Sequence, residues 1–324
     1  MRLRTWTILL AALALASLAG LALGPVALSP AAVWHALFGA GDPDTVAIVQ
    51  TLRLPRIALG VVIGAGLGVS GAALQATLRN PLAEPYLLGV SGGAAVGAVA
   101  AVTLHMSSPA LLPVAAFAGA VVAVTLVLLV ARAAGARGDP RVLLMAGVVV
   151  GAFANAAVMV LLAGAPSETV RGALWWMMGS LGDATWQGAR WVAVYVAFGG
   201  ALLIALGREI ELLALGEDPA AALGVDVERA TRRVYLAASL LAAVTVAGAG
   251  LVGFVGLVVP AIVRALGART ARGVMLGAAV AGGALVVAAD VVARTVRSPA
   301  ELPLGAVTAL IGVPFFLMRL RRMT

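Results

Sequence analysis

The feature that most constrains this chain is a succession of long apolar segments joined by short polar loops. A helix needs about 20 mostly apolar residues to cross a bilayer, and a broken helix buried in protein can be shorter. No stretch is left over for a soluble domain, so residues 1–324 are expected to form one all-α polytopic membrane domain. The sequence predicts ten membrane spans, over residues 6–28, 54–78, 83–104, 110–133, 142–164, 190–207, 233–252, 256–266, 274–293 and 305–318.

Composition agrees with a protein that lies in a membrane. Hydrophobic residues make up 62% of the 324 positions, charged residues make up 11%, and the mean hydropathy is +1.08. An ordinary soluble domain is about 45–50% apolar and about 25% charged. The first apolar segment is long for a signal sequence and has no clear small-x-small cleavage site, so it is predicted to be a span.

The positions of the arginines orient the chain. All 22 basic residues are arginine, because the sequence contains no lysine. If both termini are cytoplasmic, most arginines lie in cytoplasmic loops, as the positive-inside rule requires. This topology accounts for the net charge of +8 without nucleic-acid binding. Six arginines remain on the outer side, where the rule disfavours them: Arg53, Arg56, Arg171, Arg190, Arg294 and Arg297.

Several kinds of chemistry are excluded or disfavoured. The chain has no cysteine, and His35 and His105 stand apart from other ligands, so neither thiol chemistry nor a metal site is predicted. A P-loop requires a lysine, so a standard ATP-hydrolysis site is absent. If the chain takes part in ATP-driven transport, ATP with Mg²⁺ would be bound by another subunit, and we would expect this chain to be a transport subunit without a cofactor of its own, not an enzyme.

Polar groups are sparse within the predicted spans. Asp290 and Arg294 are four residues apart on one helix, which predicts a local ion pair. Gln75 and Asn155 are isolated amides that are expected to link helices. Neither a carboxylate relay nor a nucleophile cluster is evident, which disfavours the alternatives of a stand-alone secondary carrier or channel and an intramembrane enzyme. Glycine at every fourth position predicts a smooth face for close helix packing: Gly60, Gly64 and Gly68.

The longest predicted cytoplasmic loop, residues 209–232, contains two short helical pieces that end near Gly216 and Gly224. Glu217 and Asp218 are expected to cap the second piece. That piece is too short to be a stable helix by itself, so we expect it to sit in a groove of a partner. An ordinary capped connector is the alternative. The predicted contact surface consists of Ala220, Ala221, Ala222 and Leu223.

A series of ordered blocks between residues 53 and 314 resembles the permease subunits of ABC importers for iron-siderophores, haem and cobalamin. The resemblance implies a type II importer permease fold with ten spans, in the inner (plasma) membrane and surrounded by lipid. It also implies a homodimer around a central pathway, two ATP-binding cassette subunits beneath it, and a periplasmic substrate-binding protein above it. The blocks include Arg53-Leu54-Pro55-Arg56, Arg79-Asn80-Pro81-Leu82-Ala83-Glu84-Pro85, Gly253-Phe254-Val255-Gly256-Leu257 and Glu301-Leu302-Pro303-Leu304-Gly305.

By matching position, the resemblance implies roles for three sets of residues. Arg53, Arg56 and Arg294 would present positive charge to the binding protein. The ATPase would dock on Glu217, Asp218, Ala220, Ala221, Leu223 and Gly224. The cytoplasmic gate would be bordered by the loop 137–141 and by Asn80, Pro81, Leu82, Asp139 and Arg141. The sequence does not name the cargo, and we lean slightly toward haem or another iron chelate.

Overall fold

The structure is a computed structural model that describes residues 3–104, 106, 111–135 and 139–320. Every regular element in these residues is a helix, which confirms the all-α prediction. The membrane-length helices are α1 (Leu3–Ala22), α4 (Leu54–Thr77), α6 (Leu111–Ala133), α7 (Pro140–Ala163), α9 (Trp186–Ala205), α12 (Val227–Ala249) and α14 (Ala271–Thr295). Three further apolar helices are shorter than a full span: α5 (Val90–Thr103), α13 (Val255–Ala265) and α15 (Leu304–Leu320).

These helices correspond one to one with the ten predicted spans, but some boundaries differ. The first helix ends at Ala22, before the Gly24-Pro25 break in the apolar run. In the third predicted span the α-helix begins only at Val90. It is preceded by a 3₁₀ turn, η2 (Pro85–Leu88), and by Gly89 in the left-handed conformation. Hydropathy therefore located the spans, while glycine and proline set their ends.

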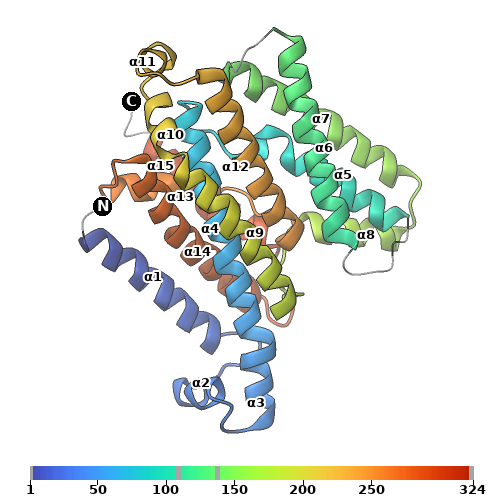
Figure 1. Ribbon diagram of the computed structural model, residues 1–324. Helices are drawn as coiled ribbons and strands as arrows, with labels where there is room; N and C mark the ends of the chain where they lie inside the picture. Colours follow the sequence, from blue (N-terminus) through green and yellow to red (C-terminus); the bar gives the residue numbers. More distant parts are fainter. Residues whose placement is uncertain (1–2, 105, 107–110, 136–138, 321–324) are drawn as a thin grey trace.

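Several short helices were not predicted from hydropathy. A π-helical segment, η1 (Ile48–Arg53), joins α3 (Pro43–Ala47) to α4, so that one continuous helix runs over 35 residues from Pro43 to Thr77. The helices α2 (Pro30–Leu37) and α8 (Ser167–Met177) are too short to register as spans. Figure 1 shows α10 (Gly207–Leu213) and α11 (Glu217–Ala222) toward the same end of the bundle as both chain ends, with α2 and α3 at the opposite end.

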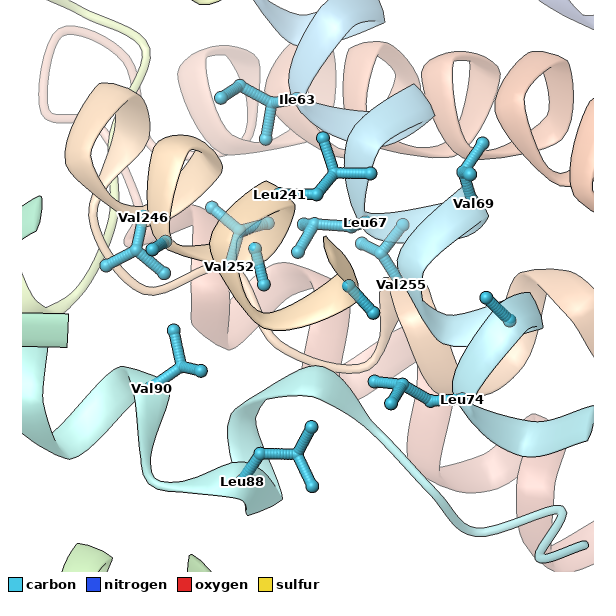
Figure 2. Close-up of a cluster of buried hydrophobic side chains, with 14 of the residues drawn as sticks. Ile63, Leu67, Val69, Leu74, Leu88, Val90, Leu241, Val246, Val252 and Val255 are labelled. Carbon is cyan, nitrogen blue, oxygen red and sulfur yellow. The ribbon is translucent and has the colours of Figure 1, made fainter. Parts of the chain in front are cut away.

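The helix α4 lies at the centre of the bundle and packs against α14, α12, α9 and α13. The prediction that the glycine face of α4 allows close helix packing is confirmed, because Gly60, Gly64 and Gly68 all lie against α14. A Cβ on Gly64 would lie 2.1 Å from the carbonyl oxygen of Gly282, so the two backbones are in direct contact there. Figure 2 shows apolar side chains of α4 meeting those of α12 and the segment before α13 in the main core.

The helices α7 and α9 are covered by the rest of the chain on only part of their surface. In the most apolar stretch of each, 33% of α7 and 17% of α9 is buried. The open face of α9 is aromatic and includes Trp191, Tyr195 and Phe198. Such a face suits contact with lipid. The open face of α7 has a different character, because it carries Asn155 beside apolar residues.

Candidate functional site

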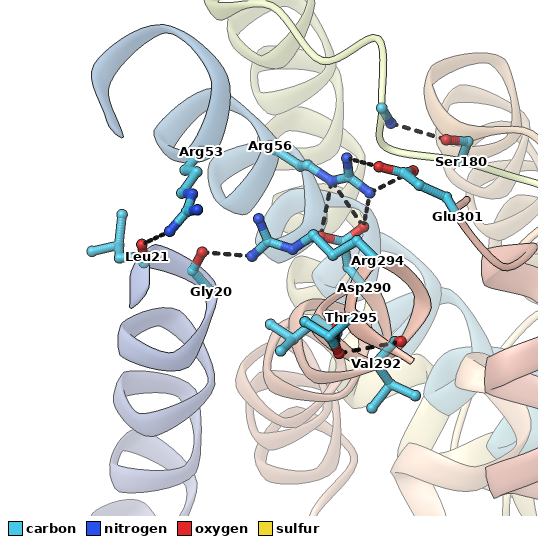
Figure 3. A network of polar contacts seen from close by, with 12 residues as sticks. Gly20, Leu21, Arg53, Arg56, Ser180, Asp290, Val292, Arg294, Thr295 and Glu301 are labelled. Atoms are coloured by element: carbon cyan, nitrogen blue, oxygen red, sulfur yellow. Dashed lines mark hydrogen bonds and ion pairs between the residues drawn. The ribbon is translucent and has the colours of Figure 1, made fainter. Parts of the chain in front are cut away.

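A buried ion cluster holds the outer end of the bundle together. The guanidinium of Arg56, in the first turn of α4, donates to Asp290 of α14 at 2.8 Å and to Glu301, in the loop before α15, at 2.7 Å. Figure 3 shows Arg56 between the two carboxylates. Hydrogen bonds from Arg56 hold the pKa of Glu301 below its usual range. This cluster ties the start of α4 to α14 and to the loop before α15, which lie 234 and 245 residues further along the chain.

Arg53 and Arg294 extend the cluster toward α1. Arg294 donates to the carbonyl oxygen of Gly20, and Arg53 donates to that of Leu21 (Figure 3). Arg53 also donates to the carbonyl oxygen of Val26. The last carbonyl groups of a helix have no partner within the helix, and these two arginines supply one for α1. Arg53 is 4% exposed and Arg294 is 3% exposed, so both side chains are enclosed by the chain.

These contacts give the outer arginines a structural explanation that the sequence did not supply. The predicted pair between Asp290 and Arg294 is present at 3.5 Å, but Asp290 makes its shorter contact with Arg56. The role of Arg53, Arg56 and Arg294 in docking a binding protein remains a prediction. Because their side chains are engaged within the chain, carboxylates of a partner would reach them only by opening the cluster.

The predicted helix at the inner end is present as α11, with two corrections. It begins at Glu217, its N-cap is Gly216, and no side chain caps it, so the prediction that Glu217 and Asp218 cap the helix was wrong. Both acidic residues lie instead in the first turn, where their negative charges interact favourably with the positive end of the helix dipole. Gly224 follows the helix with a φ of +84°, as expected for a left-handed stop.

The surface predicted for α11 also differs in one residue. Ala220 is fully buried in a small cluster with Leu213 and Ala230, so it faces α10 and α12 and cannot meet a partner. Ala221, Leu223 and Gly224 are exposed. The sequence pattern could not distinguish the buried alanine from the exposed ones, because three alanines in succession give no indication of which side is inward. The open surface of α11 is therefore smaller than predicted.

An ion pair joins α11 to the end of α4, and so brings together two segments that the sequence could not connect. Arg79, just after α4, donates to Glu217 at 3.3 Å. Arg79 has a φ of +49°, an uncommon conformation for a residue other than glycine. In the turn that follows, Asn80 accepts a hydrogen bond from the backbone N–H of Leu82 at 2.9 Å. The predicted gate turn thus sits beside the predicted coupling helix.

The second part of the predicted gate lies at the start of α7. Asp139 caps this helix by accepting a hydrogen bond from the backbone N–H of Arg141 at 2.8 Å. Residues 136–138, including Arg137, lie outside the described part of the chain. Within the described ranges, no hydrogen bond or ion pair joins Asp139 or Arg141 to the Asn80 turn. The gate assignments remain predictions.

Gln75 links helices as predicted, and its reason is visible in the structure. Its amide nitrogen donates to the carbonyl oxygens of Gly256 and Leu257 at 3.1 Å each, and its oxygen accepts from Arg264 at 2.7 Å. Pro260 has no N–H to offer the carbonyl four residues earlier, that of Gly256. Gln75 supplies that missing donor from α4. This arrangement holds the short helix α13 against the centre of the bundle.

Asn155 does not link helices within the chain, contrary to the prediction. It is exposed near the middle of α7, and among the described residues it has no hydrogen-bond partner. An exposed amide at that depth is costly in lipid, so protein or water has to meet it. His35 is exposed on α2, and His105 lies outside the described residues.

Comparison with known proteins now identifies the group to which this chain belongs. The model of the FecCD transport family matches residues 9–322. The chain belongs to this family. It is 44% identical to the cobalamin import system permease protein BtuC of Halobacterium salinarum, over 87% of this chain and 75% of that protein. It is 37% identical to the hemin transport system permease protein HmuU of Yersinia pestis, over 90% of this chain and 84% of that protein.

The fold of this FecCD chain is shared with a solved structure. A chain from an ABC transporter assigned to the metal-chelate type, in an inward-facing conformation, superposes with a TM-score of 0.86. The two sequences are 28% identical, and the match covers 97% of each chain. The FecCD protein is therefore a membrane-spanning permease subunit of an ABC importer.

Proposed function

We propose that two copies of this permease enclose a central pathway, with a substrate-binding protein at the outer end and two ATP-binding cassette subunits at the inner end. The open face of α7, with its exposed Asn155, supports a second copy across the pathway. The aromatic open face of α9 is better suited to lipid. Both termini are cytoplasmic in this arrangement, at the same end as α11.

ATP hydrolysis supplies the energy from outside the chain. Without a lysine the permease has no P-loop, so ATP and Mg²⁺ belong to the partner subunits, and the permease contributes no cofactor or catalytic residue. The permease itself changes which end of the pathway is open. The Arg79–Glu217 pair supplies a direct connection from the ATPase side to the turn at Asn80.

The cargo is proposed to be a large metal chelate. The relative that is 44% identical carries the name of a cobalamin permease, and the relative that is 37% identical carries the name of a hemin permease. Because the cobalamin permease has the higher sequence identity, we prefer a corrinoid to haem as the cargo. Uptake of cobalamin, haem and ferric citrate by proteoliposomes containing the complete importer separates the three classes, with cobalamin expected to be the fastest.

The observation that carries the proposal is α11, a six-residue helix with an exposed face at the inner end of the bundle. Most of the stability of a helix this short comes from packing, and only its inner side is packed within the chain. A groove of an ATP-binding subunit would cover the remaining face, formed by Ala221, Leu223 and Gly224. We therefore assign ATPase docking to this face.

Ala221→Trp tests the assignment, because overfilling a close-packed contact typically costs about 1–3 kcal/mol. ATPase recruitment in a pull-down and substrate uptake in proteoliposomes should fall together, while the membrane fold persists. Ala265→Trp, at an exposed alanine of the inner end of α13, serves as the matched control. Normal recruitment and uptake by the Ala221 variant would show that α11 is only a connector.

A further inference from the structure

A hollow of about 200 Å³ lies at the inner end of the bundle, where α6 ends and α7 and α12 begin. The helix α6 packs against both α7 and α12, so helix packing rather than a loop fixes the shape of the hollow. It is separate from the ion pair between Arg79 and Glu217 and from α11. Its lining includes Leu128, Leu129, Arg132, Leu143, Glu228 and Arg232.

Two guanidinium groups reach this hollow without partners in the described part of the chain. Neither Arg132 nor Arg232 has a hydrogen bond or an ion pair there, whereas the neighbouring arginines on α12 are paired with Asp226 and Glu209. Glu228 lies four residues before Arg232, on the same face of α12, but forms no ion pair with it in the described structure. The three side chains together leave a net charge of +1 on the hollow.

The apolar part of the hollow lies on its membrane side. Arg132 is in the last turn of α6, a 23-residue apolar helix, and Leu128 and Leu129 lie about one turn deeper. Leu129 is 52% exposed, so this face of α6 is open to the surroundings. Positive charge at the end of the helix and apolar surface beneath it reproduce the order of phosphate and acyl chain in a bilayer leaflet.

We propose that the hollow binds an anionic glycerophospholipid of the inner leaflet. Arg132 and Arg232 donate to the phosphate oxygens, since guanidinium groups bind phosphate through paired hydrogen bonds. An acyl chain lies along Leu128 and Leu129. Basic pockets between membrane helices on the cytoplasmic side are suited to such headgroups.

The charge of the hollow specifies the lipid further. The single negative charge of phosphatidylglycerol balances the net charge of +1. Phosphatidylcholine, which has no net charge, leaves it unbalanced, and Glu228 opposes anions of higher charge.

Lipid retention measures this site directly. The full-length permease is placed in phosphatidylcholine nanodiscs that contain a minor share of phosphatidylglycerol, and the lipids that remain bound are counted by native mass spectrometry. Loss of a charged hydrogen bond typically lowers affinity by about tenfold or more. Arg132→Gln with Arg232→Gln should therefore lose retained phosphatidylglycerol at least tenfold. Arg208→Gln with Arg269→Gln, two exposed arginines of the inner end outside the hollow, should retain it.

Two further measurements keep the proposal falsifiable. Glu228→Gln raises the net charge of the hollow and should strengthen phosphatidylglycerol retention, and it does not depend on the stability of the double variant. Unchanged or weaker retention in that variant would overturn the proposal, as would equal loss in the control pair. Displacement of the lipid by inorganic phosphate would show that the hollow is a site for free anions, and would overturn it as well.

Discussion

The helices α4 and α7 are almost equally apolar, yet they occupy opposite situations in the molecule. In the helix that contains α4, 78% of the most apolar stretch is buried within the chain, compared with 33% for α7. The chain itself completes the surroundings of α4, with α14, α12, α9 and α13 on its sides. The chain leaves much of the surface of α7 uncovered. Hydropathy locates membrane helices but does not tell an internal helix from a peripheral one.

Glycine spacing and polar side chains make the distinction that hydropathy cannot. On α4, Gly64 and Gly68 bring the backbone of α14 into direct contact. On α7, a Cβ on Gly151 would meet nothing within 4 Å, so that glycine faces open space. Gln75 on α4 has its hydrogen-bond partners inside the chain, whereas Asn155 on α7 has none in the described residues. The four predictions that follow probe this contrast.

The largest effect is expected at the contact between α4 and α14. Gly64→Val would place its Cβ 2.1 Å from the carbonyl oxygen of Gly282, and only backbone movement can relieve that clash. We expect destabilisation of at least about 4 kcal/mol and loss of most folded protein. Gly151→Val on α7 should give a near-normal yield. The measurement is monodisperse yield and thermal stability in detergent, and equal behaviour of the two variants would remove the contrast between the helices.

Breaking the ion cluster should have the next largest effect. Arg56→Ala removes the ion-pair partner of Glu301 and leaves Asp290 with only its longer contact to Arg294 at 3.5 Å, and removal of one partner from a buried pair typically costs about 3–5 kcal/mol. Arg190→Ala, at an exposed arginine near the outer end of α9, should cost little. Thermal unfolding of both variants provides the comparison. A stable Arg56 variant would mean that Asp290 and Glu301 are held by other contacts.

A smaller loss is expected for the amide on α4. Gln75→Leu removes the donor to Gly256 and Leu257 and the acceptor for Arg264, and an unsatisfied buried group typically costs about 1–3 kcal/mol. The matched variant Asn155→Leu removes an exposed amide from α7 and should leave the stability of the single chain nearly unchanged. Similar losses in both variants would place Asn155 in an internal contact.

The smallest effect on stability is expected for substitutions at the exposed end of α4. These substitutions should instead affect transport. The pair between Arg79 and Glu217 is about half exposed, and such pairs contribute about 0–1 kcal/mol. Arg79→Glu should nonetheless lower the uptake obtained for each ATP hydrolysed, and adding Glu217→Arg should restore part of it. The same exchange at Glu209 and Arg233, a partly exposed pair between α10 and α12, is the control. No recovery in the double variant would mean that the pair does not transmit movement.

The sequence was sufficient for the fold class and the ten spans, because bilayer length and apolar composition are local properties. It also identified the glycine face of α4 and the helical link made by Gln75. It could not show that Arg53 and Arg294 are enclosed, because their partners are carbonyl groups in and just after α1, which are 27 to 274 residues away in the chain. The inward orientation of Ala220 depends on how α10, α11 and α12 fold against one another, although Leu213 and Ala230 are near it in the sequence. The exposure of Asn155 depends on which helices of the bundle cover α7.

The central inference is that the open face of α7 lines a water-filled pathway between two copies, while α9 faces lipid. Since the chain contains no cysteine, single cysteines can be introduced without background labelling. Asn155→Cys on α7 and Phe198→Cys on α9, where Phe198 is 74% exposed, are compared for reaction with a water-soluble maleimide in the complete importer in membranes. We predict rapid labelling at position 155 and protection at position 198. Equal protection at both positions would contradict the account.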